Sequence, residues 1–455
     1  MRALTGSAAL VLFLLAACQA SGGDPQRAPP SAPSTLASSV APNASRSPAP
    51  SADYLMPLAL VVHATRPTAD VSVAAARRLV ASGATRWSAI GQSGGKMRVL
   101  STEDRGASAV LREVRTSSEV LGVVPADAVD VRVRVLTVGG RHPLRDPERY
   151  PLRIRSARPV PEVTTITAVG DIMLGRRVGD RHRADPGAPL KPLAKRLAAA
   201  EITLGNFEST LSADGSPTQG GDSFAASPRV RPALGAAGFD VLSLANNHVG
   251  DYGAGALRQT LDRFDAGKIK TVGAGRNLAA ARRPVIIERD GVQVGFIAVD
   301  SIGETPAATR TGPGTNRLNM PPRTGPLNRS QLKRITSDIR ALDSEVDAVV
   351  VLAHWGTQYT HRPESSQRIA SRAFADAGAD LVIGGHPHWV QGYEMAGSAV
   401  VVHSLGNFIF DMDFQTKTRE GIFLEIVLWG GVVKAVEPVP YVIDDAFTPR
   451  LIKGD

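Results

Sequence analysis

The chain has 455 residues, with 52 Lys and Arg against 43 Asp and Glu, which gives a formal net charge of +9. Its length exceeds one typical domain, and its 43% apolar and 21% charged residues exclude wholesale disorder. A single cysteine excludes an internal disulfide framework and a cysteine-based zinc finger, and 5% aromatic residues argue against a stacking platform for single-stranded nucleic acid.

The amino-terminal segment has the pattern of an export signal. A charged start precedes an apolar run from Ala8 to Ala17 that is too short to span a bilayer. The sequence Leu15-Ala16-Ala17-Cys18 resembles the lipobox of bacterial lipoproteins, in which the cysteine becomes the lipidated first residue. The resemblance implies that 1–17 is a signal peptide and that Cys18 anchors the chain to the outer face of the bacterial cell membrane. The alternative is a plain signal peptide with an incidental cysteine.

Residues 18–54 are expected to form a disordered tether. Between residues 19 and 52 there are 7 Pro, 8 Ser and 8 Ala, so 23 of 34 residues belong to three types that cannot build a core. The tether would hold the folded part of the chain away from the membrane.

A small basic α/β domain is predicted over 55–158. Apolar patterning favours strands at 58–63, 96–100 and 131–136 and a helix over 71–80. Residues 55–160 hold 17 Lys and Arg against 9 Asp and Glu, whereas 161–455 hold 32 of each, so the excess positive charge lies in this domain. A solvated face near anionic lipid headgroups is the favoured interpretation, since no motif indicates nucleic-acid binding.

Two stretches of this domain resemble a known family. Residues 71–90 and 120–129 are similar to segments of periplasmic phosphate-binding proteins. The resemblance covers only part of that fold, and a complete binder needs two lobes that close on the ligand. A phosphate sensor built on 55–160 is therefore one hypothesis, with loss of ligand binding as its alternative.

A larger α/β domain is predicted over 162–455, because strands and helices alternate after the Pro-Val-Pro hinge at 159–161. Strands are expected at 164–169, 239–244, 346–353 and 381–383, and helices at 190–200, 253–264 and 365–377. Open α/β sheets place their sites at the carboxyl ends of strands, so polar residues at those ends carry the functional signal.

Five segments supply oxygen or imidazole ligands directly after an apolar strand. They are Gly170-Asp171-Ile172-Met173, Gly205-Asn206-Phe207-Glu208, Ala245-Asn246-Asn247-His248, His354-Trp355-Gly356 and Gly385-His386-Pro387-His388. Each segment alone fits a helix cap, a turn or a core histidine. Together they favour a site for one or two divalent transition ions, because carboxylate, amide and imidazole suit Mn, Fe or Zn. Two such ions could clamp a phosphoryl group and acidify a bound water.

The set resembles the CapA family, named for poly-γ-glutamate capsule synthesis, within the calcineurin-like metallophosphoesterase superfamily. The match runs over 164–413, and its most specific pieces are 170–176, 245–248, 384–388 and 404–408. It implies a layered α/β/β/α sandwich of metallophosphoesterase type, preceded here by the smaller α/β domain. The metal ligands it implies are Asp171, Glu208, Asn247, His354, His386 and His388. His248 would be the general acid, Asp251 would orient its imidazole, and Asn407 would lie near the site.

The chain departs from the superfamily pattern at two positions. Met173 stands where the first motif has histidine, and Glu208 stands where it has a bridging aspartate. One metal position is then expected to be under-ligated, so that one ion binds tightly and a second weakly.

Two classes of function follow. The first is a metal-dependent hydrolase or transferase that acts on a cell-envelope polymer or its phosphorylated precursor. The second is a non-catalytic assembly or anchoring factor for polymer export, working with other capsule-synthesis proteins. The lipid anchor, the tether and Met173 suit the second class, whereas the ligand set with His248 suits the first.

Overall fold

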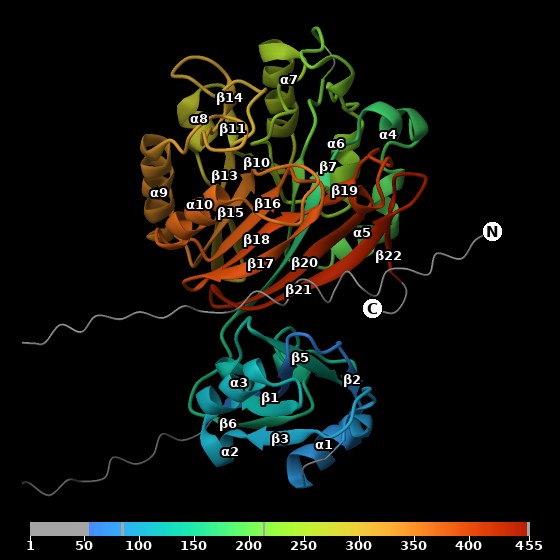
Figure 1. Cartoon of the computed structure of the whole chain (residues 1–455), viewed down its shortest axis with the longest axis vertical. Coiled ribbons are helices and arrows are strands. Elements are labelled where there is room, and N and C mark those ends of the chain that lie inside the picture. The colour runs from blue at the N-terminus through green and yellow to red at the C-terminus, as the bar shows by residue number, and fades with distance from the viewer. Residues whose placement is uncertain (1–53, 83–85, 213, 453–455) are drawn as a thin grey trace, which may run out of the picture.

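The computed structural model describes residues 54–82, 86–212 and 214–452. The predicted signal peptide, Cys18 and all but the last residue of the predicted tether lie outside these residues. The described chain folds into a small amino-terminal domain and a large layered domain, which lie at the bottom and top of Figure 1. Within the described ranges, no helix combines the length and apolarity needed to cross a membrane.

The amino-terminal domain is built on a six-stranded sheet of order β2-β5-β1-β4-β3, with β6 paired to the start of β1. Its strands are β1 (Tyr54–His63), β2 (Asp70–Val71), β3 (Arg98–Ser101), β4 (Val120–Pro125), β5 (Val133–Val138) and β6 (Arg153–Ser156). Its helices are α1 (Val73–Ser82), α2 (Thr102–Arg105) and α3 (Ala107–Thr116). Alternate residues of β1, such as Leu60 and Val61, enter separate apolar clusters because successive side chains of a strand point to opposite faces.

The large domain contains two sheets packed face to face. The first has the order β10-β9-β8-β7-β20-β21-β22, with β19 paired to β7, and the second has the order β12-β13-β15-β16-β18-β17. The first sheet comprises β7 (Val163–Ile172), β8 (Ile202–Phe207), β9 (Val241–Ser243), β10 (Lys270–Val272), β19 (Asn407–Ile409), β20 (Glu420–Trp429), β21 (Val432–Ile443) and β22 (Pro449–Leu451). The second comprises β12 (Val285–Arg289), β13 (Val292–Asp300), β15 (Ala348–His354), β16 (Leu381–Gly385), β17 (Val390–Ala396) and β18 (Ala399–Leu405). A short pair, β11 (Ala274–Gly275) with β14 (Gly314–Thr315), lies beside them.

Helices cover the outer face of each sheet. The helices are α4 (Arg176–Arg181), α5 (Lys191–Leu197), α6 (Val230–Ala236), α7 (Gly253–Asp265), α8 (Leu278–Arg282), α9 (Arg329–Asp343) and α10 (Ser365–Ala375). One apolar cluster joins α5, α6 and α7 to the first sheet, another joins α9 and α10 to the second, and a third fills the space between the sheets. The predicted α/β/β/α sandwich is therefore confirmed, and so is the smaller α/β domain before it (Figure 1).

The amino-terminal domain docks on the hairpin formed by β20 and β21. Trp429 enters the apolar cluster of the small domain and its Nε1 donates to the Leu144 carbonyl at 2.8 Å. Arg145 binds Glu425 at 2.8 Å and Glu437 at 2.7 Å. The two domains thus share both an apolar core and partly buried ion pairs.

The boundaries of two predicted helices differ from those in the structure. Val71 was expected to begin a helix, but it pairs with Val138 in β2–β5, and α1 begins at Val73. The helix expected over 190–200 is shorter, because a 3-10 turn precedes α5 and α5 ends at Leu197.

Candidate metal centre

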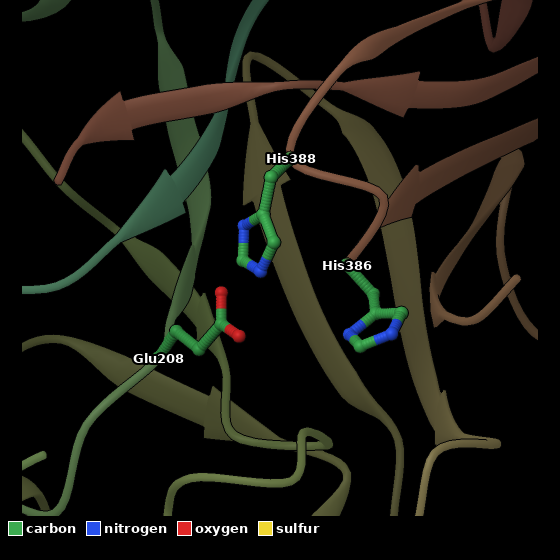
Figure 2. A group of neighbouring side chains, drawn as sticks. All are labelled: Glu208, His386 and His388. Carbon is green, nitrogen blue, oxygen red and sulfur yellow. The ribbon is translucent and has the colours of Figure 1, made fainter. Parts of the chain in front are cut away.

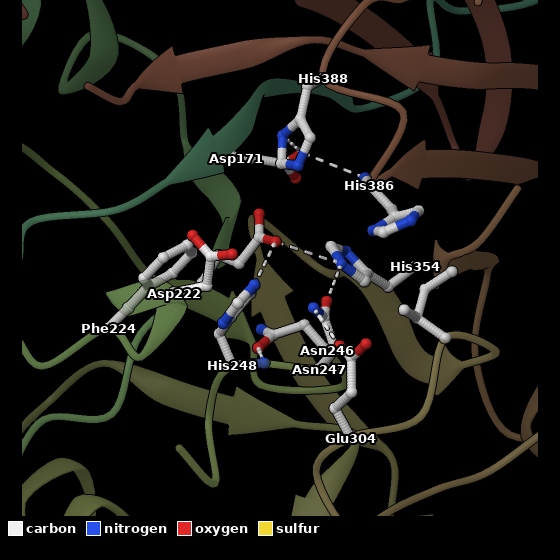
Figure 3. A network of polar contacts seen from close by, with 12 residues as sticks. Asp171, Asp222, Phe224, Asn246, Asn247, His248, Glu304, His354, His386 and His388 are labelled. Carbon is white, nitrogen blue, oxygen red and sulfur yellow. Dashed lines mark hydrogen bonds and ion pairs between the residues drawn. The ribbon is translucent and has the colours of Figure 1, made fainter. Parts of the chain in front are cut away.

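All six predicted metal ligands are buried and lie at one end of the two sheets. Asp171 ends β7 and Glu208 follows β8, both in the first sheet, while His354 ends β15 in the second. Asn247 follows β9, and His386 and His388 follow β16. Figure 3 shows how side chains from both sheets converge on one region.

One group of ligand atoms consists of Glu208, His386 and His388. A nitrogen or oxygen of each lies within 4.8 Å of the others, and Figure 2 shows the three side chains pointing toward one another. Neither carboxylate oxygen of Glu208 and neither ring nitrogen of His386 has a hydrogen-bond partner among the described residues. A buried carboxylate without a partner is costly, so this geometry fits a bound cation.

A second group consists of Asp171, Glu208 and His354, again within 4.8 Å of one another. The His354 Nε2 atom lies 3.4 Å from Glu208 Oε1 and 2.9 Å from the Asn247 Oδ1 atom. Glu208 therefore belongs to both groups, which is the arrangement needed for a carboxylate shared by two ions. The carboxylate, amide and imidazole donors fit Mn, Fe or Zn.

Burial shifts the pKa values of the titratable groups in the centre toward their uncharged forms. Burial, reinforced by Glu208, raises the pKa of Asp171 to about 7, and burial followed by Asp251 raises the pKa of Glu208 well above its ordinary value. Burial lowers the pKa of His388 to about 3 and drives that of His386 well below its usual range. The imidazoles are therefore neutral at pH 7, which is the form that binds metals, and a cation would stabilise the carboxylates as anions.

The backbone after β16 aims its two histidines into the centre. His386 and His388 have φ values of 92° and 57°, which non-glycine residues rarely adopt. The His386 backbone N–H donates to Asp171 Oδ2 at 3.0 Å, so the turn is fixed to the opposite sheet. Unusual backbone geometry of this kind concentrates at functional sites.

His248 and Asp251 form a dyad beside Glu208. The His248 Nδ1 atom lies 2.7 Å from Asp251 Oδ2, and its Nε2 atom lies 4.0 Å from Glu208 Oε1. The imidazole stacks on the ring of Phe224 at 3.7 Å between centroids. Burial lowers the pKa of His248 to about 3 and raises that of Asp251 to about 7. The geometry is that of an oriented proton carrier whose Nε2 faces the centre (Figure 3).

Asn407, whose role the sequence left open, binds the predicted ligand His388. Its Oδ1 atom accepts from His388 Nδ1 at 2.8 Å, and its Nδ2 atom donates to the Thr418 carbonyl at 2.9 Å. Because an amide oxygen can only accept, the proton of His388 is assigned to Nδ1, which leaves Nε2 free to bind an ion.

Sequence reasoning missed three supporting residues. Asn206 donates to Asp171 Oδ1 at 2.8 Å, Asn246 donates to Asn206 Oδ1 at 3.0 Å, and Glu304 accepts from Asn247 Nδ2 at 2.8 Å. Asn206 and Asn246 lie within the strand-end segments listed in the sequence analysis. Their position beside predicted ligands was the signal that could have identified them as supporting residues. Glu304 lies in a loop with no recognisable pattern.

Met173 packs among apolar side chains. It is fully buried in the apolar cluster beneath α5 to α7, and its sulfur accepts from the Gly175 backbone N–H at 3.1 Å. The position that holds histidine in the superfamily pattern is therefore part of the hydrophobic core here, in keeping with the departure noted in the sequence.

The family described as bacterial capsule synthesis protein PGA_cap matches residues 165–412, which include every ligand named above. The chain belongs to the PGA_cap family. It is 32% identical over 290 residues to the capsule biosynthesis protein CapA of Bacillus anthracis, covering 62% of this chain and 68% of that protein. It is 31% identical over 301 residues to the PGA biosynthesis protein CapA of Bacillus subtilis, covering 65% and 75%.

Solved structures resemble this PGA_cap protein more distantly. The NAD nucleotidase of Haemophilus influenzae has a TM-score of 0.37 at 12% identity, covering 65% of this chain and 54% of that chain. An ABC-type phosphate transport receptor from Vibrio cholerae has a TM-score of 0.20 at 16% identity, covering 22% and 54%. Scores this low carry nothing over to the site, and the phosphate-binding resemblance of the amino-terminal domain stays a prediction.

Proposed function

We propose that the chain is a metal-dependent hydrolase of phosphoesterase type that acts in the synthesis of a capsule, of poly-γ-glutamate or of another cell-envelope polymer. The observation that carries the proposal is the buried Glu208 carboxylate, which lacks a hydrogen-bond partner among the described residues and belongs to both ligand groups. Membership of the PGA_cap family and the names of the Bacillus relatives support the polymer as the biological context.

Each residue has a chemical role under this proposal. Asp171, Glu208, Asn247, His354, His386 and His388 would hold one or two divalent ions. When bound, such ions supply Lewis-acid chemistry, neutralising charge on a phosphoryl group and acidifying water. His248 carries a proton at Nε2 to the leaving group, and Asp251, bonded to Nδ1, holds the imidazole in place and stabilises its charged form.

We further propose that lipid on Cys18 holds the protein at the outer face of the bacterial cell membrane. The lipobox-like sequence before Cys18 and the Pro, Ser and Ala composition after it support this location. The substrate would be the envelope polymer or its phosphorylated precursor, with other capsule-synthesis proteins as partners.

Metal analysis followed by a phosphodiester assay tests the enzymatic proposal. The purified full chain should contain between one and two equivalents of Mn, Fe or Zn, and added metal should raise both its thermal stability and its hydrolysis of a chromogenic phosphodiester. His248→Gln should keep the metal and lose most of the turnover. Protein that neither holds nor responds to transition metals would contradict the proposal.

A second candidate is a non-catalytic assembly factor for polymer export. It is favoured by Met173, which leaves the centre one histidine short of the superfamily pattern. Cells that carry His248→Ala separate the two functions: an intact capsule supports the assembly factor, and a lost capsule with normal protein levels supports the enzyme.

A further inference from the structure

Arg176 is a cation at the margin of the candidate centre that the proposed chemistry does not use. Its guanidinium lies over the ring of Phe224, 4.3 Å from the centroid, and the same ring stacks on His248. Burial is the main cause of the pKa shifts of Glu208, His248 and His388, and the charge of Arg176 is one of the smaller causes in each case. Arg176 therefore faces the region where the ligands converge.

One edge of the Arg176 guanidinium is paired with a buried carboxylate. Its Nε and Nη2 atoms bind the two oxygens of Asp411, whose side chain is only 2% exposed. Arg176 also has a φ of 42°, in the left-handed region. The Asp411 pair and the Phe224 ring hold the guanidinium in one orientation, which is the condition for recognising a second anion at a defined position.

The other edge meets a carboxylate that is easily displaced. Arg176 Nη1 lies 3.3 Å from Asp222 Oδ1, and the Asp222 side chain is 82% exposed. An exposed ion pair of this length contributes little free energy. Figure 3 shows Asp222 and Phe224 on the side of the site where His248 lies, and Phe224 stacks on His248, so an anion at the position of Asp222 would lie on the His248 side of the site.

We propose that Arg176 binds an anionic group of the substrate, a carboxylate or a phosphoryl oxygen pair, and that this group displaces Asp222. The inference rests on the proposed function, because the anion belongs to the molecule that reaches the centre. Asp222 then acts as an internal competitor: it occupies the free edge of Arg176 when no substrate is bound. Uncharged analogues gain nothing from this contact, so Arg176 selects for acidic polymers or phosphorylated precursors.

Arg177 provides a matched control. It is the next residue, carries the same charge and also contacts Asp411, but its guanidinium turns to Asp413 and lies over Phe447. Loss of Arg177 removes one positive charge from the same helix end without removing the proposed anion site.

Calorimetric titration of the full chain tests the proposal with three probes: inorganic phosphate, a γ-linked tetraglutamate and the same γ-linked peptide with its α-carboxylates converted to amides. Each probe is titrated into Mn²⁺-loaded protein and into protein treated with a chelator. Arg176→Gln should weaken at least one anionic probe by about tenfold or more, and Arg177→Gln should change Kd by less than about twofold. Asp222→Asn should tighten the same probe by about two- to fivefold. The α-amidated peptide should bind all variants equally weakly.

A double-mutant cycle shows whether Asp222 acts through Arg176. The gain from Asp222→Asn should vanish in the Arg176→Gln background. Arg176→Lys keeps a charge beside Asp411 but cannot offer a second edge, so it should bind more weakly than the parent while unfolding at a similar temperature. The anionic probe that depends on Arg176 identifies the group: phosphate for a phosphorylated precursor, tetraglutamate for an acidic polymer.

Three results would overturn the proposal: binding of neither anionic probe to the parent chain, unchanged affinity in Arg176→Gln, or an equal gain from Asp222→Asn in both backgrounds. Failure of the proposed function has a different signature. In that case Arg176-dependent binding persists in the chelator-treated protein while the metal-loaded protein shows no turnover.

Discussion

Gly385 leaves just enough room for the carboxylate of Asp171: a Cβ atom at Gly385 would lie 2.4 Å from Asp171 Oδ1. Gly385→Ala should therefore displace Asp171 and lower metal affinity by about tenfold or more, as measured by titration with a metal indicator. Gly255→Ala is the control, since a Cβ there meets nothing within 4 Å and the residue lies within α7. The control should bind metal normally and gain about 0.5–1 kcal/mol of stability. Equal metal affinity in both variants would contradict this reading.

Glu208→Gln should abolish the stabilisation of the protein by metal. Without metal the variant should unfold at the same or a higher temperature than the parent, because it removes a buried carboxylate that has no hydrogen-bond partner among the described residues. With metal the parent should gain stability and the variant should not. Thermal unfolding with and without Mn²⁺ measures both effects. If metal still stabilised the variant, Glu208 would not be a metal ligand.

Asn407→Leu should weaken metal binding although Asn407 is not itself a predicted metal ligand. The variant loses the hydrogen bond that holds His388, and lost supports of this kind lower metal affinity about 10–100-fold. Gln415→Ala, an exposed position nearby in the chain, is the control and should bind metal as the parent does. Unchanged affinity in Asn407→Leu would show that His388 is fixed by other contacts.

Met173→His should not restore the superfamily pattern. Because Met173 lies in the apolar core, the imidazole would be buried without a partner, at a cost of about 2–4 kcal/mol by denaturant unfolding. Met173→Leu, which keeps volume and apolarity, should cost less than about 1.5 kcal/mol. Metal stoichiometry should not rise in either variant; an additional equivalent in Met173→His would show that this segment can turn toward the centre.

Acid should weaken the contact between the two domains. Burial acts to raise the pKa of Glu425, but Arg196 and Arg145 outweigh it and hold that pKa below its ordinary value of 4.5. The stabilisation is therefore present above about pH 4.5 and is lost as pH falls through the lower folded-state value. Glu425→Gln should destabilise the protein by about 1–3 kcal/mol at pH 7 and much less at pH 3. Glu288→Gln, at an exposed position, should have little effect at either pH.

The sequence predicted the centre better than its surroundings. That predicted ligands at the ends of apolar strands, such as Asp171 and His354, lie together could be expected because parallel strands end at the same edge of a sheet. Glu304 could not, since it reaches Asn247 from a loop whose path depends on tertiary contacts. The same holds for Met173, because the point at which β7 ends decides which way that side chain turns.

The contact between the domains was also invisible in the sequence. It depends on the β20–β21 hairpin, whose strands come from the last forty residues of the described chain and contact the first hundred. Local patterning predicted a strand or a helix one segment at a time and could not show which distant segments meet.

The amino-terminal domain and the candidate centre lie at opposite ends of β7. That domain packs near Val163, where β7 begins, whereas the candidate centre starts at Asp171, where β7 ends, about 26 Å farther along a strand that rises about 3.3 Å per residue. Under the proposed anchor at Cys18, the tether would join the molecule at the small domain, and the candidate centre would lie at the other end of β7.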